Sequence, residues 1–212
     1  MKPHEIEQKS FKIIDKEAGQ HTFNTKEWNI VRRMIHTSAD FGYMQSVRIH
    51  KDAIGAGIRA LCKGRNIITD TEMLRAGIRK KSVEKFGGQT ICLINDSNVI
   101  NESSKQGTTR SHEAVNLALE QMNDGIYAIG NAPTALLHLI SLCQEQKANP
   151  ALIIGLPVGF VNAEESKSLL TELRIPYITN MGRKGGSNVA ASVVNALIVL
   201  SEQEEKGNND FQ

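Results

Sequence analysis

A histidine and an arginine lie three residues apart in a segment whose pattern predicts a helix. The segment begins at Thr25, a suitable N-cap. Four apolar residues recur at about 100° per residue and define one side of this helix: Trp28, Val31, Met34 and Ile35. Arg33 and His36 share a different face, because residues three apart are neighbours on a helix. His36 is therefore a candidate proton donor or acceptor, since imidazole titrates near neutral pH. The spacing alone equally fits an exposed histidine without a chemical role.

A glycine-rich segment with two cations is the second candidate for chemistry. It runs Gly182-Arg183-Lys184-Gly185-Gly186-Ser187 and precedes a predicted helix at 188–200. Free N–H groups and the helix dipole favour an anion at such a position, and the two cations add positive charge. The order of residues is not that of a Walker A motif, which ends in Gly-Lys-Ser/Thr. A carboxylate therefore suits the segment as well as a phosphate, and a plain glycine turn with solvated cations is the alternative.

Another glycine motif, Gly55-Ala56-Gly57-Ile58-Arg59-Ala60, formally matches the G-x-G-x-x-A fingerprint of dinucleotide-binding proteins. Its glycines fall inside a predicted helix at 52–61 that Asp52 begins. The fingerprint requires them in the turn between a strand and a helix. Small residues at these positions predict close helix packing, and nucleotide binding is the weaker hypothesis.

Strands and helices alternate along the chain. Strands are predicted at 47–49, 66–70, 90–94, 126–130, 151–155 and 176–180. Helices are predicted at 3–18, from Thr25 past His36, and at 52–61, 71–78, 111–122, 134–143, 163–173 and 188–200. This alternation indicates one α/β domain, residues 1–200, with a mainly parallel sheet and helices on both faces. Ligands of such sheets bind at the carboxyl ends of the strands, here in the predicted loops 96–110, 130–134, 155–162 and 182–187. Residues 201–212 are polar, and we expect a frayed tail there.

Composition excludes several classes of function. The 212 residues carry a net charge of +2 and 5% aromatic residues, which is unlike a nucleic-acid-binding protein. We expect no membrane association, because no apolar run could span a bilayer and the N-terminus lacks a signal-peptide pattern. Three scattered cysteines indicate neither a disulfide framework nor a metal site, and they suit a reducing cytoplasm.

The nonapeptide from Arg33 to Phe41, Arg-x-Ile-His-Thr-x-Ala-Asp-Phe, resembles the signature of the precorrin-8X methylmutases, also described as cobalt-precorrin-8 methylmutases. Further blocks resemble the same family in the same order. They are Ile68-Thr69-Asp70, Thr109-Arg110-Ser111, Gly130 to Leu136, Gly155 to Val161 and Gly182 to Ser187. The resemblance extends from about Ser10 to Leu200, nearly the whole chain.

The resemblance implies an isomerase of cobalamin (vitamin B12) biosynthesis that needs no cofactor and no metal of its own. Its substrate would be a tetrapyrrole polycarboxylate, (cobalt-)precorrin-8. A methyl group would move from C-11 to C-12 of that macrocycle to give cobyrinic or hydrogenobyrinic acid. A cytoplasmic homodimer is the expected assembly.

Five residues are assigned to the site. His36 matches the family's catalytic histidine, and Ser10 and Arg33 match positions that contact the substrate. Arg110 and Lys184 are added as substrate-binding residues from their charge and loop position.

Two other functions remain open at this level. A non-catalytic tetrapyrrole carrier would use the same cationic groove without needing His36. A Rossmann-like nucleotide-binding protein would depend on residues 55–60. The sequence also leaves open whether the substrate carries cobalt and whether His36 is charged, since a helix C-terminus favours imidazolium and nearby Arg33 disfavours it.

Overall fold

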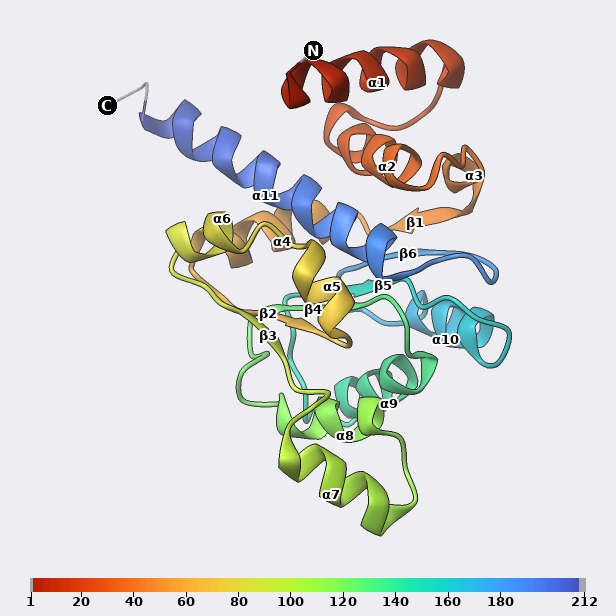
Figure 1. Ribbon diagram of the computed structural model, residues 1–212, viewed down its shortest axis with the longest axis vertical. Helices are drawn as coiled ribbons and strands as arrows, with labels where there is room; N and C mark the ends of the chain where they lie inside the picture. The colour runs from red at the N-terminus through yellow and green to blue at the C-terminus, as the bar shows by residue number, and fades with distance from the viewer. Residues whose placement is uncertain (1, 210–212) are drawn as a thin grey trace.

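The computed structural model describes residues 2–209, and within them a six-stranded sheet lies between two layers of helices (Figure 1). The strand order is β1-β6-β5-β4-β2-β3. β1 runs antiparallel to β6, whereas all other neighbouring strands pair in parallel. The predicted α/β architecture with a mainly parallel sheet is thus confirmed. The strands are β1 Val47–Ile49, β2 Ile67–Thr69, β3 Thr90–Cys92, β4 Ile126–Ile129, β5 Leu152–Gly155 and β6 Tyr177–Asn180.

The helices cover both faces of the sheet. They are α1 Pro3–Ala18, α2 Thr25–Ser38, α3 Tyr43–Ser46, α4 Ala53–Cys62, α5 Glu72–Gly77, α6 Lys80–Lys85, α7 Ser97–Gln106, α8 Arg110–Leu117, α9 Pro133–Gln144, α10 Ala163–Leu170 and α11 Ser187–Asn209. Successive side chains of a strand point to opposite faces, and β4 shows the consequence. Ile126 and Ala128 belong to the apolar cluster with α2, α4 and α11. Tyr127 and Ile129 belong to the cluster with α8, α9 and α10. No helix of the described chain is long and apolar enough to cross a bilayer.

Helix α2 carries the Arg33 and His36 positions and is fixed at both of its ends. The side chain of Asn24 accepts hydrogen bonds from the backbone N–H groups of Lys26 and Glu27, and the Glu27 carboxylate accepts one from the N–H of Asn24. Asn24 is therefore the N-cap, and the predicted cap at Thr25 is wrong by one residue. The amide oxygen of Asn24 provides the reciprocal capping box with Glu27. At the other end Ala39 adopts a left-handed conformation.

The apolar side of α2 is buried, as the periodicity predicts, and α2 packs against α11. Its buried residues are Ile30, Val31, Met34 and Ile35. Trp28 is only half-buried, and its indole N–H donates to Asp15 of α1. His36 lies off this side and is exposed.

Several predicted boundaries are wrong. The expected loop at 96–110 contains α7, whose first turn is capped by the Asp96 carboxylate. The last helix does not end at Leu200, because Ser201 is fully buried and Glu204 pairs with Lys26 of α2. Residues 201–209 are therefore helical rather than frayed, and 210–212 lie outside the described residues. The helices predicted to reach Met122 and Leu173 end at Leu117 and Leu170.

The glycines of the 55–60 motif lie inside α4 and permit close packing, as predicted. A Cβ atom on Gly57 would lie 2.9 Å from a methyl carbon of Leu152 in β5 and 3.0 Å from one of Leu197 in α11. This motif therefore brings a helix close to the sheet. It lacks the strand-to-helix turn that a dinucleotide needs, which removes the basis for the nucleotide-binding hypothesis.

Candidate functional site

The structure brings Ser10 and His36 together. The Ser10 hydroxyl, in α1, lies 2.8 Å from Nδ1 of His36, in α2, within hydrogen-bond distance. The two helices lie side by side (Figure 1). Phe11 packs edge-on against the imidazole, with ring centroids 5.3 Å apart. The hydrogen bond and the ring contact together fix the orientation of the imidazole and leave Nε2 as the nitrogen available to a ligand.

Arg33 lies beside this pair. Its guanidinium is 3.0 Å from the Glu7 carboxylate and 5.2 Å from the centre of the Phe11 ring. The side chain is 21% exposed, so one part of the planar group is held by α1 while another part stays accessible. A guanidinium held in this way can bind a further carboxylate with two parallel hydrogen bonds.

A pocket of about 250 Å³ opens next to Arg33 and His36. The end of α5 and the first turns of α11 also line it, with small or amide residues: Gly77, Asn188, Ala191, Ser192 and Asn195. Small residues let a flat molecule approach the helix, and the amide of Asn188 offers a donor and an acceptor. The Asn195 amide is already bonded to the Gly77 carbonyl and to the N–H of Arg79. The imidazole thus borders a cavity that mixes apolar and polar groups.

Lys184 reaches the C-terminal end of the same helix. Its ammonium lies 2.6 Å from the carboxylate of Asp40, which follows α2. This hydrogen bond, together with one from the backbone N–H of Gly42, lowers the pKa of Asp40. The loop 181–186 is thereby tied to the helix that bears His36.

Arg110 is not brought to this group within one chain. It begins α8, in the helical layer on the opposite face of the sheet, and its guanidinium lies 3.4 Å from the side-chain oxygen of Asn95. Thr109, its neighbour, is hydrogen-bonded to Thr134 in the first turn of α9, so Arg110 stands near the carboxyl ends of the strands.

Asp70 is a buried residue to which the sequence assigned no role. Its carboxylate is 1% exposed and accepts hydrogen bonds from the backbone N–H groups of Gly130, Asn131 and Ala132, at 3.1, 2.7 and 2.8 Å. Burial raises the pKa of Asp70, and these three bonds oppose that rise. Asp70 therefore holds the turn after β4 in place. The sequence signal that could have indicated this role is the position of Asp70 directly after a strand.

That turn packs against the start of α11. A Cβ atom on Gly130 would lie 2.6 Å from Cα of Ser187, so only glycine fits there. The Ser187 hydroxyl is also 3.0 Å from the hydroxyl of Thr71, next to Asp70. Asp70 thus positions a turn that supports the helix lining the His36 pocket.

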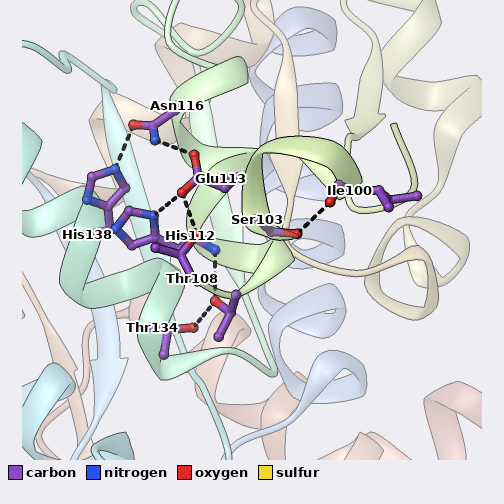
Figure 2. Close-up of polar contacts among 9 residues, drawn as sticks. Ile100, Ser103, Thr108, His112, Glu113, Asn116, Thr134 and His138 are labelled. Carbon is purple, nitrogen blue, oxygen red and sulfur yellow. Dashed lines mark hydrogen bonds and ion pairs between the residues drawn. The ribbon is translucent and has the colours of Figure 1, made fainter. Parts of the chain in front are cut away.

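A second polar cluster joins α8 to α9 (Figure 2). The rings of His112 and His138 are stacked with centroids 3.6 Å apart. Glu113 accepts a hydrogen bond from Thr108, which lowers its pKa, while burial lowers the pKa of His138. Asn116 bridges Glu113 and His138. The cluster fixes the segment that leads to Arg110. Among the described residues no group of three or more His, Cys, Asp or Glu side chains is placed to hold a metal ion.

Comparison with known proteins gives a consistent result along nearly the whole chain. A family model described as precorrin-8X methylmutase matches residues 5–200. A cobalt-precorrin-8 methylmutase of Priestia megaterium is 46% identical over 95% of this chain and 90% of its own length. A protein of the same name from Leptospira interrogans is 45% identical over 93% of this chain and 94% of its own length. A precorrin-8X methylmutase of Sinorhizobium is 34% identical over 91% of this chain and 92% of its own length.

The fold is shared with a solved structure as well. The crystal structure of precorrin-8X methylmutase from Thermus thermophilus superposes with a TM-score of 0.88 at 40% sequence identity. The match covers 95% of this chain and 97% of the Thermus chain.

Proposed function

The chain belongs to the precorrin-8X methylmutase family, and we propose that Ser10, Arg33 and His36 form the centre at which it acts. Members of the family are isomerases of cobalamin biosynthesis that move a methyl group within one molecule. The nucleotide-binding and carrier alternatives therefore give way to an enzyme. The observation that carries the assignment of the site is the 2.8 Å contact between Ser10 and His36 at the edge of a pocket.

The roles of the three residues follow from the chemistry of an isomerisation. No atom enters or leaves when a methyl group moves from C-11 to C-12, so catalysis consists of holding the ring and placing a proton near it. His36 holds or moves that proton through Nε2. Ser10 keeps the imidazole in a fixed orientation through Nδ1. Arg33 binds a carboxylate of the substrate, in competition with Glu7.

Two further cations complete the proposed contacts with substrate carboxylates. Lys184 stands at the end of α2 and is 60% exposed, so its ammonium can bind a carboxylate while paired with Asp40. Arg110 stands at the carboxyl ends of the strands but in the other helical layer. It would serve a carboxylate far from the reacting carbons, on the opposite side of a wide ring.

The proposed substrate carries cobalt. Support comes from the comparisons, because relatives named cobalt-precorrin-8 methylmutase are 46% and 45% identical to this chain. The precorrin-8X methylmutases of Thermus thermophilus and Sinorhizobium are 40% and 34% identical. The proposed product is then the cobalt-containing corrin, cobyrinic acid.

The proposal extends to a homodimer in the cytoplasm. The resemblance supports the dimer. The His36 pocket, about 250 Å³, is smaller than the roughly 300–1,000 Å³ that is usual for small-molecule sites. A second copy of the chain could supply the remaining surface that a tetrapyrrole needs. Three free cysteines, one of them exposed, suit a reducing compartment. Sedimentation equilibrium and cell fractionation test the two statements.

Direct turnover tests the function. Purified protein is mixed with the cobalt-containing and the cobalt-free precorrin, and the absorbance change of the macrocycle is followed together with analysis of the product. We expect rearrangement of both, with a higher kcat/KM for the cobalt form. Binding of both without conversion of either would make the protein a carrier, and conversion of the cobalt-free form alone would reverse the choice of substrate.

A further inference from the structure

Lys167 is a charged side chain in the interior of the fold. It lies on α10 and is 0% exposed. Its ammonium donates a hydrogen bond to the carbonyl oxygen of Lys184 at 2.7 Å and a longer one to the side-chain oxygen of Asn180 at 3.5 Å. Within residues 2–209 no ion pair includes Lys167. The hydrogen-bond partners of the ammonium are thus two neutral oxygens, one from Lys184 in the loop and one from Asn180 at the end of β6.

This buried environment favours the neutral amine of Lys167 over the charged ammonium. Burial lowers the pKa of Lys167 to about 8, and nearby Glu164 offsets only part of this effect. An apolar side chain of similar volume would fill the same space without the cost of desolvating a charge. Packing therefore does not explain the ammonium at this position, and its role has to be read from its hydrogen bonds.

Those contacts converge on the loop 181–186. The Lys184 carbonyl also accepts a hydrogen bond from the side-chain amide of Asn180, at 2.9 Å. Asn180 is the last residue of β6, so the carbonyl is held from the sheet by Asn180 and from α10 by Lys167. The loop has its central carbonyl fixed from two sides.

The same loop packs directly on the loop that follows β5. The N–H of Gly186 donates to the carbonyl of Leu156, and the N–H of Gly159 donates to the carbonyl of Arg183. A Cβ atom on Gly185 would clash with that Leu156 carbonyl, at 2.3 Å. Fixing the Lys184 carbonyl therefore fixes two loops at the carboxyl edge of the sheet.

Lys184 connects this arrangement to the His36 helix. Its backbone carbonyl is held by Lys167, while its side chain pairs with Asp40 at the end of α2. We infer that Lys167 is a positioning residue, which fixes the 181–186 loop and so presents the Lys184 side chain at the end of the His36 helix. The inference about the loop rests on geometry alone; its consequence for substrate binding rests on the proposed function.

The test separates these two parts. Lys167→Met keeps length and apolar volume but removes every donor, whereas Lys167→Arg keeps donors at a similar reach. Lys105→Met, at a side chain that is 67% exposed on α7, is the matched control. Amide hydrogen exchange is measured residue by residue on the folded proteins, without substrate.

In Lys167→Met, exchange at the Gly159 and Gly186 amides should become about tenfold faster or more, because a hydrogen bond from a charged donor is lost. The Leu156 amide, which directly follows β5 and is bonded to the Ile129 carbonyl of β4, should not change. Lys167→Arg should restore part of the protection, and Lys105→Met should behave as wild type. Unchanged exchange at Gly159 and Gly186 in Lys167→Met would overturn the inference, whatever the activity.

Kinetics then test the consequence. Lys167→Met should raise KM for the cobalt-precorrin several-fold and change kcat little, since it displaces a binding side chain and touches no reacting atom. Faster loop exchange with an unchanged KM would show that the loop is held for another purpose, and this would overturn the positioning role. If wild type converts no precorrin, the proposed function fails while the exchange result still stands. Should Lys167→Met fail to fold, Lys167→Leu, which also removes every donor, takes its place with the same expected and contradicting exchange results.

Discussion

Replacing Asp70 by alanine should destabilise the protein strongly, although this residue touches neither His36 nor the pocket. The carboxylate is 1% exposed and accepts three backbone N–H groups. Each buried donor left without a partner costs about 1–3 kcal/mol. Removing the carboxylate also removes its own desolvation cost, which offsets part of the loss. The expected net decrease in the free energy of unfolding is about 3–5 kcal/mol.

Asparagine at the same position separates charge from shape. Asp70→Asn fills the same volume and can keep an oxygen for Asn131 and Ala132, but it turns an amide group toward the N–H of Gly130. The expected loss is about 1–3 kcal/mol, the cost of one unsatisfied donor. Asp52→Ala is the matched control, because the Asp52 side chain is 58% exposed, makes no capping hydrogen bond and only approaches His50, at 3.8 Å. Its effect should stay within about 0.5 kcal/mol.

Urea denaturation followed by far-UV circular dichroism at pH 7 gives these free energies, and calorimetry gives the melting temperatures. In a chain of this size 1 kcal/mol corresponds to about 2–4 °C, so Asp70→Ala should melt about 6–20 °C below wild type. A loss under about 1 kcal/mol for Asp70→Ala would show that the turn after β4 does not depend on the carboxylate. Equal decreases in the free energy of unfolding for Asp70→Ala and Asp70→Asn would show that the shape of the Asp70 side chain contributes nothing to the effect.

Three further outcomes are expected. Arg33→Lys keeps the charge but loses the planar fork, so product affinity measured by absorbance titration should fall about tenfold; affinity equal to wild type would show that Arg33 binds no carboxylate. Binding should weaken as salt rises from about 0.01 to about 1 M, over which the screening length falls from about 30 to about 3 Å, and Lys184→Gln should reduce that dependence; affinity that is flat with salt would contradict the cationic site. The pKa of Lys167 is about 8 in the folded protein and about 10.4 in an unfolded chain, so between these pH values the unfolded chain binds more protons and stability rises with pH. Relative to Lys167→Met, wild type should therefore gain about 2 kcal/mol in denaturation free energy from pH 7.5 to pH 9.5, and an unchanged difference would mean that Lys167 titrates normally.

The parts of the fold that periodicity determines were predictable. The alternation of strands and helices gave the sheet, and the apolar positions of residues 28–35 gave the buried side of α2 and left His36 exposed, as observed. Gly57 was correctly expected to permit close packing. These features depend on local pattern and on burial, which a sequence displays directly.

Features that depend on long-range partners were not predictable. The helix α11 continues to Asn209 because Ser201 is buried and Glu204 pairs with Lys26, a residue 178 positions away. The roles of Asp70 and Lys167 arise from backbone groups of distant loops, to which their own neighbours in sequence give no clue. Helices α3, α6 and α7 were missed because α3 and α6 are short and α7 is mostly polar, so their apolar residues show too weak a helical periodicity.

The grouping of Ser10, Arg33 and His36 was predictable only from the family resemblance. Ser10 in a polar helix would by its pattern alone face solvent, and its contact with His36 needs the packing of α1 on α2. Lys184 was chosen for charge and lies at the end of the His36 helix, whereas Arg110 was chosen on the same ground and lies in the other layer.

The central claim is that His36 acts on a proton during the rearrangement, and single-turnover absorbance with His36→Ala and His36→Asn tests it most directly. Both variants should melt close to wild type, because the side chain is exposed and its removal opens no core cavity. Both should still bind the cobalt-precorrin. The rate of the single turnover should fall by about 10²–10⁴, the usual contribution of a positioned acid–base group. A wild-type rate in either variant, with substrate bound, would remove His36 from the mechanism.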